Sequence, residues 1–294
     1  MKLAAIKDEV YLDALMAAGI IGVAGGIIGS LFIRTNNFVN VLRKKVLGTS
    51  KPRKVIEACA LVVLTVSVVY ACAYFRDQDA VCKIINDKDD ALVSNNFKLI
   101  QFTCRKGYYH RLATMFLSRQ TEVLKIFMTD GSKFLQSNMI IFVGSWIFFT
   151  YITSGTAVPC GIFLPCMVIG CGLGHIYHPL HLYLCALFPE SIKNDPINSE
   201  TVSILGAAAV LSGSTRMTYC LAVIMLETTA NVDLFLPVIF TLFCSYGSGF
   251  LLNSRSIYKG ALRTKNIPII NKDVPKVNRN KLASEIMIGE PARL

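Results

Sequence analysis

The sequence predicts an all-α protein that crosses a membrane several times. Apolar residues make up 53% of its 294 residues and charged residues only 17%, and the mean hydropathy is +0.50. This composition is too hydrophobic for an ordinary soluble domain of that length. The apolar residues gather in separate runs, some of which reach the roughly 20 residues that cross a bilayer as a helix. Together these observations indicate a polytopic helical membrane protein.

The apolar runs place the membrane segments along the chain. The first, at 12–33, is rich in glycine, which lets neighbouring helices approach closely. The second lies at 55–75. Four further runs are shorter than a full crossing, at 139–153, 163–177, 202–211 and 234–250. Short segments interrupted by glycine and proline are typical of binding sites that half-helices build inside a membrane.

The positive charges predict the orientation of these segments. The stretch at 34–54 is expected to be a short loop, and it carries no acidic residue among its cluster of cations, Arg43, Lys44, Lys45, Lys51, Arg53 and Lys54. By the positive-inside rule this loop is cytoplasmic, and so is the C-terminal tail. The polar stretch at 76–138 then forms a loop on the lumenal or extracellular side. Cys82 and Cys104 lie in it, and an oxidising compartment permits a disulfide there, although spacing alone leaves the pairing open.

The net charge of +11 is concentrated next to the membrane segments and in the tail. Lysine and arginine at such positions attract anionic lipid headgroups. The expected partner of these charges is therefore membrane lipid, and no nucleic-acid partner is expected.

The segment Gly161-Ile162-Phe163-Leu164-Pro165 is the most informative motif of the chain. It lies where one apolar run ends and another begins, so a helix is expected to start inside the membrane. The first N–H groups of a helix have no acceptor within it, and the helix dipole adds partial positive charge, so such an end attracts anions. Gly161 lets a ligand approach the backbone, and Pro165 has no N–H that needs an acceptor. The alternative is a simple turn between two helices.

Three histidines, His175, His178 and His181, are spaced three residues apart, a pattern that could gather metal ligands on one helix face. We expect Pro179 to interrupt the helix, and no acidic or thiol side chain adjoins the histidines. The favoured interpretation is that they mark the boundary between membrane and water, and no metal site is predicted.

Two charged residues, Arg216 and Glu227, lie near the ends of apolar runs. A charge inside a membrane is a functional candidate. Both residues also fit helix ends whose long side chains reach the interface, which is the interpretation we favour. The small residues at 206–209 and 212–214 are expected to permit close helix packing.

Four stretches resemble, in order and spacing, the second half of the CLC family of voltage-gated chloride channels and anion/proton exchangers. They are SGTAVPCGIFLP, GCGLGHIYH, LGAAAVLSGSTRMTYCLAVIMLETTAN and SRSIYKGALRTKNIPII. The resemblance covers residues 1–270 and implies the second half of the CLC inverted-repeat helical fold, with broken helices. The stretch FTCRKGYYHRLATMFL is most similar to the branch with plant vacuolar and animal endolysosomal members, which favours an intracellular membrane over the plasma membrane.

The resemblance also implies chloride transport and the residues that carry it. In the family the anion lies between helix N-termini near the middle of the membrane, and the matching donors here are the backbone N–H groups of Ile162 and Phe163, within Gly161–Pro165. Tyr258 in SIYKGAL matches the anion-coordinating tyrosine, although its position alone favours an interfacial anchor. Several modest donors suit chloride, because an ion that is conducted must also leave. Chloride is the transported ligand, and no cofactor is expected.

Other parts of the family pattern are not found in this sequence. The turns Gly-Ser-Gly-x-Pro and Gly-x-Glu-Gly-Pro, and the two glutamates that distinguish exchangers from channels, belong to the family's first half. Residues 271–294 resemble a cytoplasmic linker and the start of a CBS domain. We therefore expect this chain to be one part of a larger transporter. The alternative is a truncated fragment that does not transport and acts only as an interaction partner.

The family resemblance further implies a homodimer, formed through the helices around 218–230 and 234–249. A membrane-embedded enzyme is not expected, because the sequence shows no Ser/His/Asp set, no HExxH motif and no paired intramembrane aspartates.

Overall fold

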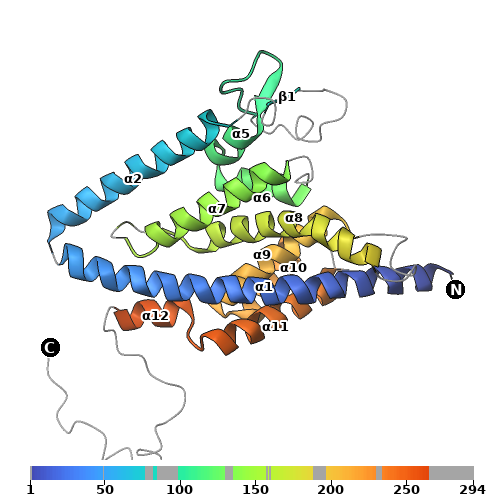
Figure 1. Cartoon of the computed structure of the whole chain (residues 1–294). Coiled ribbons are helices and arrows are strands. Elements are labelled where there is room, and N and C mark those ends of the chain that lie inside the picture. Colours follow the sequence, from blue (N-terminus) through green and yellow to red (C-terminus); the bar gives the residue numbers. More distant parts are fainter. Residues whose placement is uncertain are drawn as a thin grey trace, which may run out of the picture.

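In the computed structural model, α-helices make up most of the described chain (Figure 1). The structure describes residues 2–48, 50–76, 82–84, 99–129, 135–156, 158, 160–187, 197–229 and 234–264. Within these residues, four segments are long and apolar enough to cross a membrane, Asp13–Val46, Lys51–Tyr74, Phe163–Cys185 and Phe235–Leu262. The prediction of an all-α polytopic protein is confirmed. The predicted CBS segment at 271–294 lies outside the described residues.

The first helix, α1 (Lys2–Leu47), is longer than its apolar run. The prediction of a loop from 34 onward was wrong, because the helix continues to 47 and α2 (Lys51–Tyr74) begins soon afterwards. Long-range contacts of Arg43 explain the difference. Its guanidinium pairs with Glu57 on α2 and donates to the backbone oxygens of Ile152 and Ser154, at 2.7 and 3.1 Å. These partners hold the last turns of α1 in the helical state.

The stretch predicted as a polar loop, 76–138, contains ordered structure. Strands β1 (Cys82–Ile84) and β2 (Tyr108–His110) pair antiparallel, and a disulfide joins Cys82 to Cys104. Two short helices follow, α5 (Arg111–Leu117) and α6 (Gln120–Thr129). Their apolar side chains, fully buried Leu112 and Phe127 among them, pack against α7 (Gln136–Thr153) and α8 (Phe163–Leu187). The sequence did not predict this ordered structure, because these apolar residues have partners distant in sequence. That the stretch lies outside the membrane stays a prediction.

Helix α8 also differs from its prediction. It runs for 25 residues and passes through Pro179, which was expected to interrupt it. A proline removes one backbone hydrogen bond, and membrane helices tolerate that loss where neighbouring groups compensate. Pro179 lies on the exposed side of α8.

The centre of the molecule is α9 (Ser199–Thr215), which is buried along most of its length. It packs against α1, α8 and α11 (Phe235–Leu252). Helices α10 (Thr218–Thr229) and α12 (Ile257–Thr264) come later in the chain and also contact α9. A Cβ at Gly206 would run into the backbone of Gly170, and a Cβ at Gly213 would run into that of Gly25. The prediction that these small residues allow close helix packing is confirmed.

Candidate anion site

The predicted anion-binding motif forms the start of α8. The N–H of Cys166 donates to the carbonyl oxygen of Ile162 at 3.1 Å, and this is the first hydrogen bond of the helix. The N–H groups of Ile162, Phe163 and Leu164 therefore precede the helical ladder, and Pro165 has none to offer. Within the described residues, no acceptor is recorded for these three donors.

The start of α8 is also accessible. Gly161 is exposed, and a Cβ placed on it would meet no atom within 4 Å. Leu164 is 37% exposed, and Ile162 and Phe163 are partly buried. Free donors, helix dipole and open space therefore coincide at one point, which is the arrangement that binds anions at helix N-termini.

Packing against α9 fixes the direction of this helix end. Cys166, in the first turn of α8, is 2% exposed, and the Ser214 hydroxyl of α9 lies 3.8 Å from its sulfur. The same hydroxyl donates to Val210 O at 2.9 Å, so it is held within its own helix. The first turn of α8 thus lies on the C-terminal end of a buried helix and has little freedom to rotate.

Arg216 ends α9 and holds the end of α11. Its backbone adopts a left-handed conformation, with φ 63°, that closes α9. The side chain donates from Nε to Gly213 O at 3.1 Å, and from one terminal nitrogen to Gly249 O and Asn253 O at 2.7 and 2.6 Å. Arg216 thus lies at a helix end, as predicted, and its side chain binds carbonyls left free at the ends of α9 and α11. Its place at the membrane interface stays a prediction. Glu227 lies exposed in the last turn of α10, as its helix-end interpretation predicts.

Tyr258, the second part of the predicted anion site, lies on α12. Its side chain is 44% exposed. Helix α12 packs against α1 and α9, with Ile257 buried and Gly260 lying against Asn37. Within the described residues, no hydrogen bond or ring contact joins Tyr258 to the 161–165 segment. The structure therefore links the two parts of the predicted site through the shared supports α1 and α9.

The three histidines of α8 do not converge on one point. His175 pairs with Ser199 Oγ and Phe127 O, both at 2.8 Å, and His178 Nε2 lies 3.2 Å from Ile197 O. His181 turns to a different neighbour, Asp13. His175 and His181 are buried within the protein, and their predicted position at the boundary between membrane and water stays a prediction. A three-histidine metal site is absent from this part of the described chain.

The sequence did not predict the buried cluster that His181 forms with Asp13 and Cys185. Its Nε2 lies 2.8 Å from Asp13 Oδ1 and 3.4 Å from Cys185 Sγ. Cys185 follows His181 by four residues, a spacing that places both on one helix face, so this half of the group was visible in the sequence. Asp13 lies 168 residues away, and no local pattern connects it to α8.

These features define a class: a polytopic helical membrane protein in which a helix begins with free backbone donors. Residues 3–249 match the family described as voltage gated chloride channel. The chain therefore belongs to the voltage-gated chloride channel family, as the sequence resemblance predicted.

Several relatives share this similarity. Chloride channel protein CLC-a of Arabidopsis thaliana is 30% identical, over 97% of this chain and 36% of its own length. The H(+)/Cl(-) exchange transporter 7 of Mus musculus is 27% identical, over 90% of this chain and 31% of its own length. Chloride channel protein C of Dictyostelium discoideum is 27% identical, over 91% of this chain and 34% of its own length. The chain thus spans about a third of the length of the curated relatives it matches.

A solved structure shows the same fold. A eukaryotic CLC transporter, known from a crystal structure, aligns with 89% of this chain and 38% of its own, with a TM-score of 0.55 and 20% sequence identity. This similarity confirms that the helices are arranged as in one part of a CLC membrane domain.

Proposed function

We propose that this chain forms part of a chloride pathway across a membrane. The observation that carries the proposal is the start of α8, where three N–H donors precede the first helical hydrogen bond and adjoin the exposed, open position of Gly161. Membership of the voltage-gated chloride channel family supports the same function. The relatives include proteins named chloride channel and a proton/chloride exchanger, and anion transport is common to both names.

The proposed anion ligands are the backbone of Gly161–Pro165 and the side chain of Tyr258. The N–H groups of Ile162 and Phe163 replace part of the ion's water shell, and Gly161 lets the ion approach. The phenol hydroxyl of Tyr258 supplies a further donor. All of these are neutral, so binding is favourable without trapping the ion as a buried lysine would.

A homodimer is the proposed assembly, with α10 and α11 at the interface. Both helices expose large apolar side chains, such as Tyr219 and Val223 on α10 and Leu236 and Phe243 on α11. These side chains are exposed to lipid or to a partner, and a second copy would cover them.

The proposed location is an intracellular membrane, by similarity to vacuolar and endolysosomal members of the family. The cation-rich end of α1 lies on the cytoplasmic side, and the Cys82–Cys104 disulfide on the opposite side.

Chloride flux tests this function. The protein, expressed from its full reading frame and reconstituted in liposomes, is compared with Tyr258→Phe and Phe163→Ala. The first removes one hydroxyl donor and the second alters packing at the start of α8. We expect each to change the selectivity among chloride, nitrate and bromide or the rate of transport. Tyr183→Phe is the matched control, because Tyr183 is exposed near the far end of α8. Unchanged rate and selectivity in both variants would contradict the site assignment.

A further inference from the structure

Three side chains that bind metals in proteins meet between the first helix and the end of α8. Asp13 comes from α1, and His181 and Cys185 come from successive turns of α8. Their ligand atoms all lie within 4.8 Å of one another. The group is far from the start of α8 along the helix, and none of its members belongs to the proposed anion site.

The spacing of the three ligand atoms is close to that of a tetrahedral metal site. Metal–ligand distances of about 2.0–2.3 Å at tetrahedral angles place neighbouring ligand atoms about 3.3–3.6 Å apart. Here Cys185 Sγ lies 3.4 Å from His181 Nε2 and 3.2 Å from Asp13 Oδ1. The nitrogen and Oδ1 lie 2.8 Å apart. Entry of an ion therefore requires these atoms to separate by about 0.5 Å or less.

The ligands are oriented by partners outside the group. The N–H of Ile197 donates to the second carboxylate oxygen of Asp13 at 3.0 Å. The hydroxyl of Tyr177 lies 3.2 Å from His181 Nδ1, the ring nitrogen opposite the ligand nitrogen. Because a hydroxyl can either donate or accept, it can pair with Nδ1 in either tautomer. Such contacts fix the orientation of metal ligands.

Burial and charge favour a divalent ion at this point. Asp13, His181 and Cys185 are 2, 1 and 6% exposed. A carboxylate and a thiolate together carry two negative charges, so with a divalent cation the site is neutral, which removes the cost of an uncompensated charge in a buried place. On binding, the Cys185 thiol releases its proton to solvent. Mixed sulfur, nitrogen and oxygen ligands suit zinc among the common ions.

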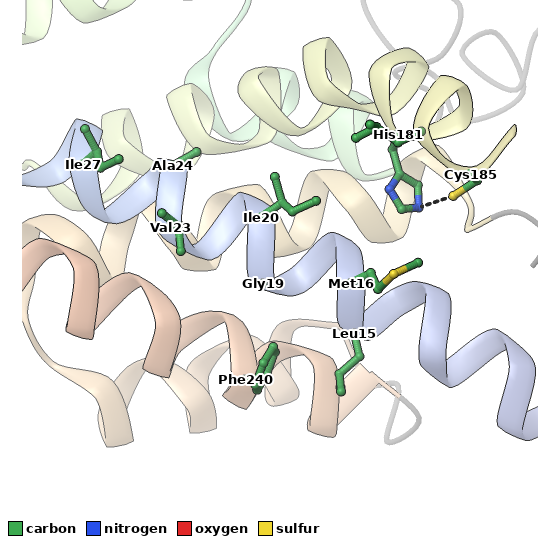
Figure 2. A pocket seen from close by; sticks show the side chains of 11 residues that line it. Leu15, Met16, Gly19, Ile20, Val23, Ala24, Ile27, His181, Cys185 and Phe240 are labelled. Carbon is green, nitrogen blue, oxygen red and sulfur yellow. Dashed lines mark hydrogen bonds between the residues drawn. The ribbon is translucent and has the colours of Figure 1, made fainter. Parts of the chain in front are cut away.

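A groove gives access to the group. It has a volume of about 870 Å³, and its lining includes His181, Cys185, Met16 and Ile20. Figure 2 shows the imidazole of His181 and the sulfur of Cys185 turned toward one another at one end of this groove. A water molecule at that end can supply the fourth ligand of a tetrahedral ion.

We propose that Asp13, His181 and Cys185 bind a zinc ion that ties the start of the first membrane segment to the end of α8. The ion holds α1 and α8 together near the opposite end of α8 from the proposed anion site. This inference does not depend on the proposed function, since metal binding is measured without any transport assay. The competing explanation is a clamp made of hydrogen bonds alone, which gives the same contacts with no metal.

Cobalt titration of the chelator-treated full-length protein in detergent tests the site. In the wild type we expect a thiolate-to-cobalt absorption band together with the visible bands of a tetrahedral ion, and competition by zinc. Cys185→Ser abolishes the thiolate band. Cys171→Ser is the matched control, since Cys171 is also buried on α8 but lies outside the group, and it retains the band. Tyr177→Phe weakens cobalt binding by roughly tenfold.

Melting temperature supplies a second readout that separates the two explanations. Zinc raises the melting temperature of the wild type and of Cys171→Ser, and leaves that of Asp13→Asn unchanged. If Cys185→Ser does not fold, Asp13→Asn and Tyr177→Phe decide the question by the same two measurements. A wild type that shows no thiolate band and no zinc-dependent melting would overturn the proposal and establish the hydrogen-bonded clamp. Equal cobalt spectra for the wild type and Cys185→Ser would overturn it as well.

Discussion

Two helix starts in this molecule differ in whether a side chain accepts hydrogen bonds from their first N–H groups. At the start of α5, the side chain of His110 accepts a hydrogen bond from the N–H of Ala113 at 2.9 Å and so caps the helix. At the start of α8, Ile162 takes the equivalent position, and its apolar side chain cannot cap. In α5 a side chain of the chain itself accepts from a free N–H group, whereas in α8 the free N–H groups remain available to an external acceptor.

The difference supports the proposed anion site at the start of α8, which contains no charged side chain. A cap contributes typically about 1 kcal/mol, so an uncapped helix start sacrifices some stability. At α8 this loss occurs where Gly161 also opens space in front of the donors. A stability cost that coincides with accessibility favours a functional explanation, and a buried helix start such as that of α5 has no such feature.

The largest expected effect comes from closing the open start. Ile162→Asp places a carboxylate where it can accept from the N–H of Leu164, and it puts a negative charge beside the proposed chloride position. Two like charges about 4 Å apart repel by about 4 kcal/mol at an effective dielectric constant near 20, which corresponds to roughly a thousandfold. We expect chloride flux to fall to background while the melting temperature holds or rises.

Ile162→Asn is the control for this change, because it can cap the helix without adding charge. It should reduce flux by less than the aspartate does. Full chloride flux through liposomes containing Ile162→Asp would show that the start of α8 does not face the ion path.

A smaller effect is expected from removing a single backbone donor. Replacing the amide of Phe163 by an ester exchanges its N–H for an oxygen and leaves the side chain intact. A hydrogen bond to a charged partner contributes about 1.5–3 kcal/mol, so chloride affinity should weaken by about tenfold or more. Calorimetric titration of the purified protein with chloride measures this change.

The matching ester at Ala113 sharpens the comparison. It removes the N–H that His110 accepts at the start of α5. This ester should leave chloride affinity unchanged and lower the melting temperature. An equal loss of chloride affinity in the two esters would mean that the effect is one of folding and not of binding.

The helix start that forms the proposed site was predictable from sequence because it is local. Gly161-Ile162-Phe163-Leu164-Pro165 carries its own helix start, and the structure begins α8 at Phe163 as that motif implies. The ends of helices were less predictable, because they depend on distant partners. Arg43 extends α1 by contacts with Glu57 and with the end of α7, and Asp13 finds His181 across 168 residues. Apolar periodicity contains no information about either pairing.

Removing the cap of α5 should affect stability but not transport. His110→Ala deletes the acceptor of the Ala113 N–H and leaves Ala73 O without its partner at 3.1 Å. Loss of a helix cap costs about 0.5–2 kcal/mol, and an unpaired buried carbonyl adds to it. Thermal melting should show this loss, whereas His110→Asn should recover part of it because its side-chain oxygen can still cap. A fall in chloride flux at temperatures where His110→Ala stays folded would contradict the separation of the two helix starts.

The smallest expected effect is a dependence of α5 on pH. Burial lowers the pKa of His110 below its ordinary value of 6.5, and its hydrogen bond to Ala73 O opposes that shift only in part. Since Nδ1 accepts from Ala113, Nε2 carries the hydrogen, and protonation at Nδ1 would destroy the cap. The unfolded chain then binds more protons than the folded one below about pH 6.5, so this contribution to stability is present at neutral pH and is lost as the pH falls toward the lowered pKa. Hydrogen exchange at the Ala113 amide should accelerate on acidification relative to an amide in the middle of α9, after correction for intrinsic rates. His110→Asn should remove that difference, because its amide does not titrate, and the N–H donors at the start of α8 should show no comparable change because no titratable side chain caps them.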